Sequence, residues 1–198
     1  MGFHEYEPNP VFIKNLNRLK LKSGGGVFIP LCGKTLDISW LLTQGYKVVG
    51  VELSEISIQQ LFDEIGVQPE IIVLENRKRC RAENVDVLAG DFFDVTLESI
   101  GHIDAIFDRG SLDALPENMR SQYAKHLQCI ADNAPQLLVC FEYDQALMEG
   151  PPFSIRFAEL NRYYGNGHNL QLIESSDASS RLSVGFPCVE KVWLVGPR

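Results

Sequence analysis

Three charged residues, Glu52, Asp91 and Arg109, come just after short apolar runs that are typical of buried strands. The carboxyl ends of parallel strands meet at one edge of a sheet, so we expect these three side chains to share a crevice. A carboxylate after the second strand can accept hydrogen bonds from both hydroxyls of a ribose. A guanidinium can hold an anionic ring and favour its ionised form. The pattern therefore predicts a site for a ligand that contains a ribose.

The elements that position these residues begin in the segment 27–52. An apolar run over 27–29 stops at Pro30, whose missing N–H ends strand pairing. A corner over 31–34 follows, and a helical pattern begins at Thr35 and ends at Gly45. A second apolar run then leads to Glu52. This is the first βαβ unit of a doubly wound α/β sheet.

The corner over 31–34 has one glycine, Gly33. Proteins that bind dinucleotides use G-x-G-x-x-G, because the backbone must approach a pyrophosphate closely. The corner therefore favours a nucleoside without phosphate, and S-adenosylmethionine fits this description. Leu31 and Gly33 are expected to approach it through backbone groups. Asp91 is placed to bind the adenine amino group, and the Phe92 ring to cover the adenine face.

Further apolar runs alternate with helical patterns along the chain. We expect strands over 85–89, 103–107, 136–141, 170–173 and 189–195, and a strand or hairpin arm over 69–74. We expect helices over 54–65 and 116–132, and a further helix that follows Ser154 and ends at about Tyr164. The charged segment 75–84 is interpreted as a solvated loop, because acids interrupt its basic run. The alternation predicts one α/β domain over residues 1–198.

Five strings, PLCGK, GVELSE, GDFF, DRGSLDALP and GPPFS, occur in this order. In order and spacing they resemble the thiopurine S-methyltransferase family, and its bacterial branch most closely. The resemblance implies a Rossmann-like class I methyltransferase that depends on S-adenosylmethionine, with helices on both faces of a seven-stranded, mostly parallel sheet. The implied strand order is 3-2-1-4-5-7-6, with the last strand antiparallel. The implied activity is methyl transfer to small aromatic or heterocyclic thiols, and bacterial relatives are also linked to selenium and tellurium detoxification.

The resemblance also implies roles for particular residues. Arg109 matches an arginine that contacts both cofactor and acceptor, and we expect it to be the catalytic residue. Phe3 and His4 match a G-F-H motif on the acceptor side of the pocket, and Arg181 lies near a second arginine that faces the acceptor. The alternative for Arg109 is an ion pair with Asp108 that braces the loop.

Other interpretations stay open at the corner. Glu52 could cap the helix that begins near Ser54 instead of binding a ribose. Cys32 could be a nucleophile, but no histidine lies in a recognisable partner motif, and a small buried filler is favoured. Lys34 could neutralise a carboxylate of the cofactor or be solvated.

The resembling family carries a further segment before G-F-H, with tryptophans that pack over the cofactor, and this sequence starts at Met1 without it. Without such an aromatic cover we expect weaker S-adenosylmethionine binding than in a full-length relative.

Composition narrows the classes of partner. A net charge of −8 argues against nucleic acid and against anionic membranes. The five cysteines are scattered without a C-x-x-C pair, so we expect neither disulfides nor a metal, and a cytoplasmic location. No signal peptide or membrane span is visible, and we expect a monomer.

Alternative functions remain. A methyltransferase of the same fold could act on thiocyanate, halide or sulfide. A non-catalytic module could bind S-adenosylmethionine without turning over a thiol. An NAD-dependent oxidoreductase is disfavoured by the single corner glycine and by the absence of Tyr-x-x-x-Lys.

Overall fold

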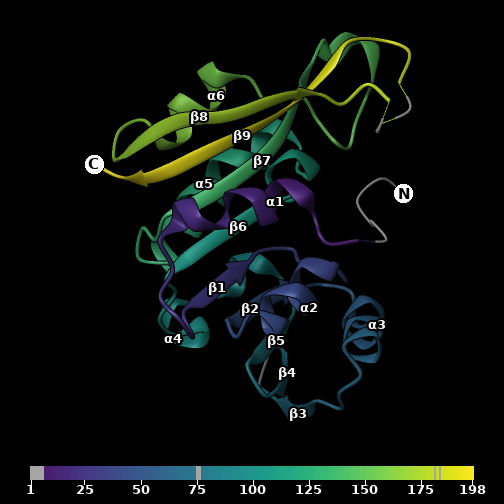
Figure 1. Cartoon of the computed structure of the whole chain (residues 1–198), viewed down its shortest axis with the longest axis vertical. Helices are drawn as coiled ribbons and strands as arrows, with labels where there is room; N and C mark the ends of the chain where they lie inside the picture. The colour runs from purple at the N-terminus through teal and green to yellow at the C-terminus, as the bar shows by residue number, and fades with distance from the viewer. Residues whose placement is uncertain (1–6, 75–76, 181, 183) are drawn as a thin grey trace.

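The computed structural model describes residues 7–74, 77–180, 182 and 184–198. One sheet of nine strands runs through these residues, in the order β3-β4-β5-β2-β1-β6-β7-β9-β8 (Figure 1). The strands are β1 (Gly26–Ile29), β2 (Lys47–Glu52), β3 (Glu70–Val73), β4 (Lys78–Ala82), β5 (Val85–Ala89), β6 (Ala105–Arg109), β7 (Gln136–Tyr143), β8 (His168–Asp177) and β9 (Cys188–Pro197). The helices are α1 (Pro10–Asn15), α2 (Leu36–Thr43), α3 (Glu55–Ile65), α4 (Leu97–Ile100), α5 (Glu117–Ile130) and α6 (Phe157–Tyr164).

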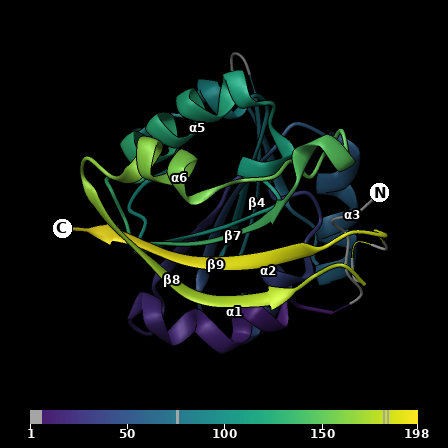
Figure 2. The ribbon, with the colours of Figure 1, turned by 90° about the horizontal axis from the view of Figure 1, so that it is seen from above.

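The helices cover both faces of this sheet (Figure 2). On one face, α1, α2 and α3 pack on the strands, and the Phe12 ring stacks on Phe107 of β6 with 3.8 Å between centroids. On the other face, α4, α5 and α6 pack on the strands around the fully buried Tyr123. The central strand β1 is buried along its whole length, which explains its continuous apolar sequence.

The order of the seven expected strands is confirmed. Strands β5, β2, β1, β6 and β7 are parallel neighbours, and β9 lies antiparallel to both β7 and β8. Renumbered along the chain without β3 and β4, the order is 3-2-1-4-5-7-6. The carboxyl ends of the parallel strands therefore meet at one edge, as the α/β prediction requires.

The predicted count of seven strands is wrong, because a hairpin of β3 and β4 extends the sheet beyond β5. The interpretation of 75–84 as a solvated loop is also wrong for β4, which forms part of this hairpin. Arg79 and Arg81 point to one face and bind Asp86 of β5, with Nη2–Oδ2 distances of 2.6 and 2.9 Å. Cys80 points to the other face and is 7% exposed. One apolar residue between two arginines gives too weak an alternation to predict a strand.

No helix in the described part of the chain is long and apolar enough to span a bilayer.

Candidate functional site

A cavity of about 330 Å³ lies at the carboxyl ends of β1 and β6. It is lined by Ile29, Leu31, Cys32, Gly33, Lys34, Thr35, Asp37, Ser57, Phe107, Arg109 and Gly110. The strands end here, so their following loops supply most of the wall, together with the first turn of α2. The structure thus brings together three of the predicted site residues, Leu31, Gly33 and Arg109.

The corner after β1 is held in an unusual backbone conformation. Leu31 and Gly33 have φ values of +45° and +54°, and for Leu31 this left-handed conformation costs about 1–2 kcal/mol. Such strain persists where the surroundings fix the backbone, and it clusters at ligand sites. The Cys32 N–H donates to the carbonyl of Val51 at 2.9 Å, which ties the corner to the end of β2.

Glu52 lies directly beside this corner. Its Oε2 accepts a hydrogen bond from the Gly33 N–H at 2.8 Å, and its Oε1 accepts one from the Ser54 N–H at 2.7 Å. The carboxylate therefore braces the corner and also satisfies an N–H at the start of α3, as the capping alternative expected. It is half-buried, and each oxygen keeps a second lone pair for a ribose hydroxyl.

Cys32 and Lys34 have structural partners. A Cβ on Gly50 would lie 2.8 Å from the Cys32 Sγ, so glycine in β2 makes room for this side chain. Burial raises the pKa of the Cys32 thiol, which disfavours the nucleophilic thiolate. Cys32 is 6% exposed and packs in the core, as the filler interpretation predicts. Lys34 forms an ion pair with Glu64 of α3 at 3.1 Å while it lines the cavity.

Asp91 and Phe92 begin the turn after β5. The Asp91 Oδ1 accepts a hydrogen bond from the Phe93 N–H at 2.9 Å, and the side chain is exposed. The Phe92 ring is 3% exposed and packs on Tyr123 at 4.8 Å between centroids. The expectation that this ring covers the adenine needs correction, because the ring belongs to the core, and only its backbone is available to border a ligand.

Arg109 is held from both sides along the chain. Before it, the fully buried Asp108 accepts hydrogen bonds from the Tyr123 hydroxyl at 2.9 Å and from the Gln136 amide at 3.0 Å. After it, the Ser111 hydroxyl donates to the carbonyl of Pro30 at 2.7 Å. These bonds fix the backbone that places the guanidinium in the cavity wall, so Asp108 braces the loop through α5 and β7.

Phe3, His4 and Arg181, the three other predicted acceptor residues, lie outside the described residues.

Sequence comparison decides the family. The chain matches the family model of thiopurine S-methyltransferase over residues 1–194. A thiopurine S-methyltransferase of Xanthobacter autotrophicus is 45% identical over 194 residues, which cover 98% of this chain and 91% of that protein. The chain belongs to the thiopurine S-methyltransferase family. Another member, from Pseudomonas aeruginosa PAO1, is 42% identical over 197 residues, covering 98% of this chain and 89% of that protein.

Solved structures agree on the fold of this family member. A TehB-like SAM-dependent methyltransferase from Corynebacterium glutamicum has a TM-score of 0.60 at 15% identity and covers 93% of this chain and 86% of its own. Magnesium protoporphyrin IX methyltransferase from Synechocystis, solved with bound SAM, has a TM-score of 0.62 at 17% identity, covering 94% and 75%. The Rossmann-like fold is thus confirmed. Membership of the thiopurine S-methyltransferase family confirms the methyltransferase activity and, with it, S-adenosylmethionine as the cofactor.

The methyltransferase has a second buried acid near Arg109 that the sequence did not indicate as special. Both carboxyl oxygens of Asp113 are buried and have no hydrogen-bond partner among the described residues. Burial first, and the charge of Asp108 second, raise the pKa of Asp113 to about 8, although Arg109 and Arg120 oppose the shift. The folded protein therefore keeps the Asp113 carboxyl protonated at neutral pH.

We expect Asp113→Asn to stabilise the methyltransferase increasingly as the pH rises. The unfolded chain releases this proton near pH 4 and the folded chain only near pH 8, so the unfolding free energy of the parent falls between these values. The difference between variant and parent should grow by about 1.4 kcal/mol per pH unit. Urea denaturation at pH 5.5, 6.5 and 7.5 measures it, and a difference that stays constant with pH would contradict this assignment.

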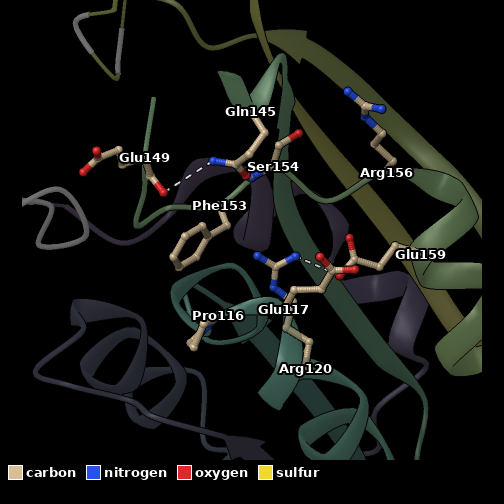
Figure 3. Close-up of a pocket in the computed structure, with 9 residues that line it drawn as sticks. All are labelled: Pro116, Glu117, Arg120, Gln145, Glu149, Phe153, Ser154, Arg156 and Glu159. Atoms are coloured by element: carbon tan, nitrogen blue, oxygen red, sulfur yellow. Dashed lines mark hydrogen bonds and ion pairs between the residues drawn. The ribbon is translucent and has the colours of Figure 1, made fainter. Parts of the chain in front are cut away.

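A larger cavity, of about 460 Å³, lies between the loop after β7 and the starts of α5 and α6 (Figure 3). At its floor the Arg120 side chain is 4% exposed, and its Nη1 donates to Glu159 Oε1 at 2.8 Å. Its guanidinium also lies 5.1 Å from the ring centroid of Phe153, in the loop after β7. Arg120 was not predicted from the sequence, although its spacing from Tyr123, Ala124 and Leu127 puts it on the buried face of α5.

Replacing Arg120 with methionine should lower the unfolding free energy by about 3 kcal/mol, because Glu159, whose side chain is only 12% exposed, would lose its cation. The double variant Arg120→Met, Glu159→Leu should recover most of this loss. Urea denaturation of the three proteins tests the coupling. Equal losses in the single and double variants would show that the ion pair is not what joins α5 to α6.

Proposed function

We propose that this methyltransferase transfers the methyl group of S-adenosylmethionine to the sulfur of small aromatic or heterocyclic thiols, thiopurines among them. The observation that carries this proposal is the position of Arg109 in the wall of the cavity, next to the corner that Glu52 braces. We also propose that it acts as a single-domain monomer in the cytoplasm, and that selenium and tellurium compounds are further acceptors.

The residues of the cavity fit the cofactor. Leu31 and Gly33 would meet it through the backbone, Glu52 would accept hydrogen bonds from the ribose hydroxyls, and Asp91 would bind the adenine amino group. The described lining also contains a carboxylate and two cations, which can match the ammonium and carboxylate groups at the amino-acid end of the cofactor. When bound, S-adenosylmethionine supplies a methyl group on a positively charged sulfur, which is already an activated leaving group.

The protein therefore has little acid–base work to do. Arg109 would hold the acceptor near the cavity mouth and favour its thiolate, because a neighbouring cation lowers the pKa of a thiol. Ile29 and Phe107 contribute apolar wall, which excludes water from a reaction in which opposite charges cancel. Alignment at about 3–3.5 Å between the reacting atoms supplies the rest of the rate gain.

Methyl transfer from labelled S-adenosylmethionine to a panel of acceptors tests this function. We expect label in aromatic and heterocyclic thiols and much less in thiocyanate, iodide and sulfide. The Cys32→Ser variant should methylate the same acceptors, because Cys32 is a packing residue. Label in the inorganic nucleophiles alone would favour the other class of acceptor. Tight cofactor binding without any labelled product would favour a non-catalytic binding module.

A further inference from the structure

The described residues that line the cofactor cavity include two cations and one carboxylate. The cations are Lys34 and Arg109, and the carboxylate is Asp37. Glu52 lies beside the corner and has the Gly33 and Ser54 N–H groups as donors, and Glu64 is paired with Lys34. Asp37 is therefore the carboxylate among the described residues that line this cavity.

Asp37 is held firmly in this position. It lies in the first turn of α2 and is 2% exposed. Its Oδ1 accepts a hydrogen bond from the Asn9 N–H at 2.6 Å, and its Oδ2 accepts one from the Thr35 hydroxyl at 2.8 Å. Each carboxylate oxygen can accept a second bond, so a further donor can still be satisfied there.

The electrostatics of Asp37 favour a cationic donor. Burial raises its pKa, and the Asn9 N–H, the Thr35 hydroxyl and the charge of Arg109 only partly oppose that shift. A buried carboxylate is costly until a cation approaches it. S-adenosylmethionine carries an α-ammonium group and an α-carboxylate at its methionine end. A cavity with Asp37 and Arg109 in its wall matches this zwitterion.

We propose that Asp37 binds the α-ammonium group of the cofactor. The inference rests on S-adenosylmethionine as the cofactor and not on the identity of the acceptor. Asp37 also holds the chain before α1, since the Asn9 side chain accepts from the Phe12 N–H at 3.0 Å and so caps that helix. The methionine end of the cofactor thus meets the residue that ties the N-terminal helix to α2.

Calorimetry with two ligands tests this role of Asp37. S-adenosylhomocysteine has the amino-acid end and 5′-methylthioadenosine lacks it, so their affinity ratio reports on that end alone. Asp37→Asn should weaken the binding of S-adenosylhomocysteine about tenfold or more, the equivalent of one charge-assisted hydrogen bond. The same change should alter the affinity for 5′-methylthioadenosine by less than about threefold. Equal weakening of both ligands would overturn the proposal, because a distorted corner would affect both.

Two further measurements keep the test decisive. Asp63→Asn removes the charge of an exposed acid of α3 that does not line this cavity, so the ratio for this variant should stay near that of the parent. The parent protein should bind the S-adenosylhomocysteine analogue with a hydroxyl in place of the α-amino group about tenfold more weakly or worse. Equal binding of the analogue and S-adenosylhomocysteine overturns the proposal without any variant. Failure of the parent to bind S-adenosylhomocysteine at all would instead contradict the cofactor.

Discussion

Arg109→Ala will lower kcat/KM for an aromatic thiol by on the order of 100-fold or more, the usual loss when a preorganised donor to a reacting anion is removed. The guanidinium lies in the cavity wall, on a loop fixed by the bonds of Asp108 and Ser111. Without it the acceptor loses both an anchor and the cation that favours its thiolate. The loss should be greatest below the pKa of the free thiol and smaller above it.

The pH profile separates this role from a structural one. Arg109→Lys keeps a cation but not the planar fork, so it should recover part of the activity. Arg162→Ala is the matched control, because this arginine is 64% exposed in α6 and its ion pair with Glu117 is 3.8 Å long. An Arg109→Ala enzyme with parental kcat/KM at pH 7 would show that another group holds the acceptor.

Glu52→Ala will weaken S-adenosylhomocysteine binding by on the order of 100-fold. Two charge-assisted hydrogen bonds to the ribose would be lost, at about 1.5 kcal/mol each. The Gly33 and Ser54 N–H groups would also lose their acceptor, which loosens the corner. Isothermal titration calorimetry gives the change directly.

Glu52→Gln and Asp63→Ala complete this comparison. The amide keeps one acceptor oxygen, so Glu52→Gln should fall between the parent and Glu52→Ala. Asp63 is an exposed acid of α3 that bonds Gln59 at 2.9 Å, and its removal should leave the affinity unchanged. If Glu52→Ala binds as tightly as Asp63→Ala, Glu52 is only a brace between β2 and α3.

The sequence was most informative where local pattern and topology agree. The alternation of buried strands and amphipathic helices predicted the parallel sheet, and the position of Glu52 and Arg109 after their strands predicted that they lie at one edge. Leu31 and Gly33 followed from the same topology. Strand β4 was missed because its residues are mostly charged, and its stability comes from pairing with β5.

The features that the sequence did not predict depend on contacts between distant segments. The Asn9 N–H meets Asp37 across 28 positions, so the first-turn carboxylate of α2 could not be recognised as part of the cavity wall. The Phe92 ring turns into the core because α5 presents Tyr123 to it. The Asp113 carboxyl is buried by several elements and has no hydrogen-bond partner among the residues that the structure describes, and no spacing in the sequence predicts that.

A crystal structure of the protein with S-adenosylhomocysteine tests directly whether Glu52 binds the ribose of the cofactor. We expect the adenosyl group beside the corner at 31–34, with both ribose hydroxyls hydrogen-bonded to the Glu52 carboxylate and the sulfur facing Arg109. An adenosyl group bound elsewhere, or a Glu52 side chain turned to bulk solvent while the cavity is filled, would contradict this expectation.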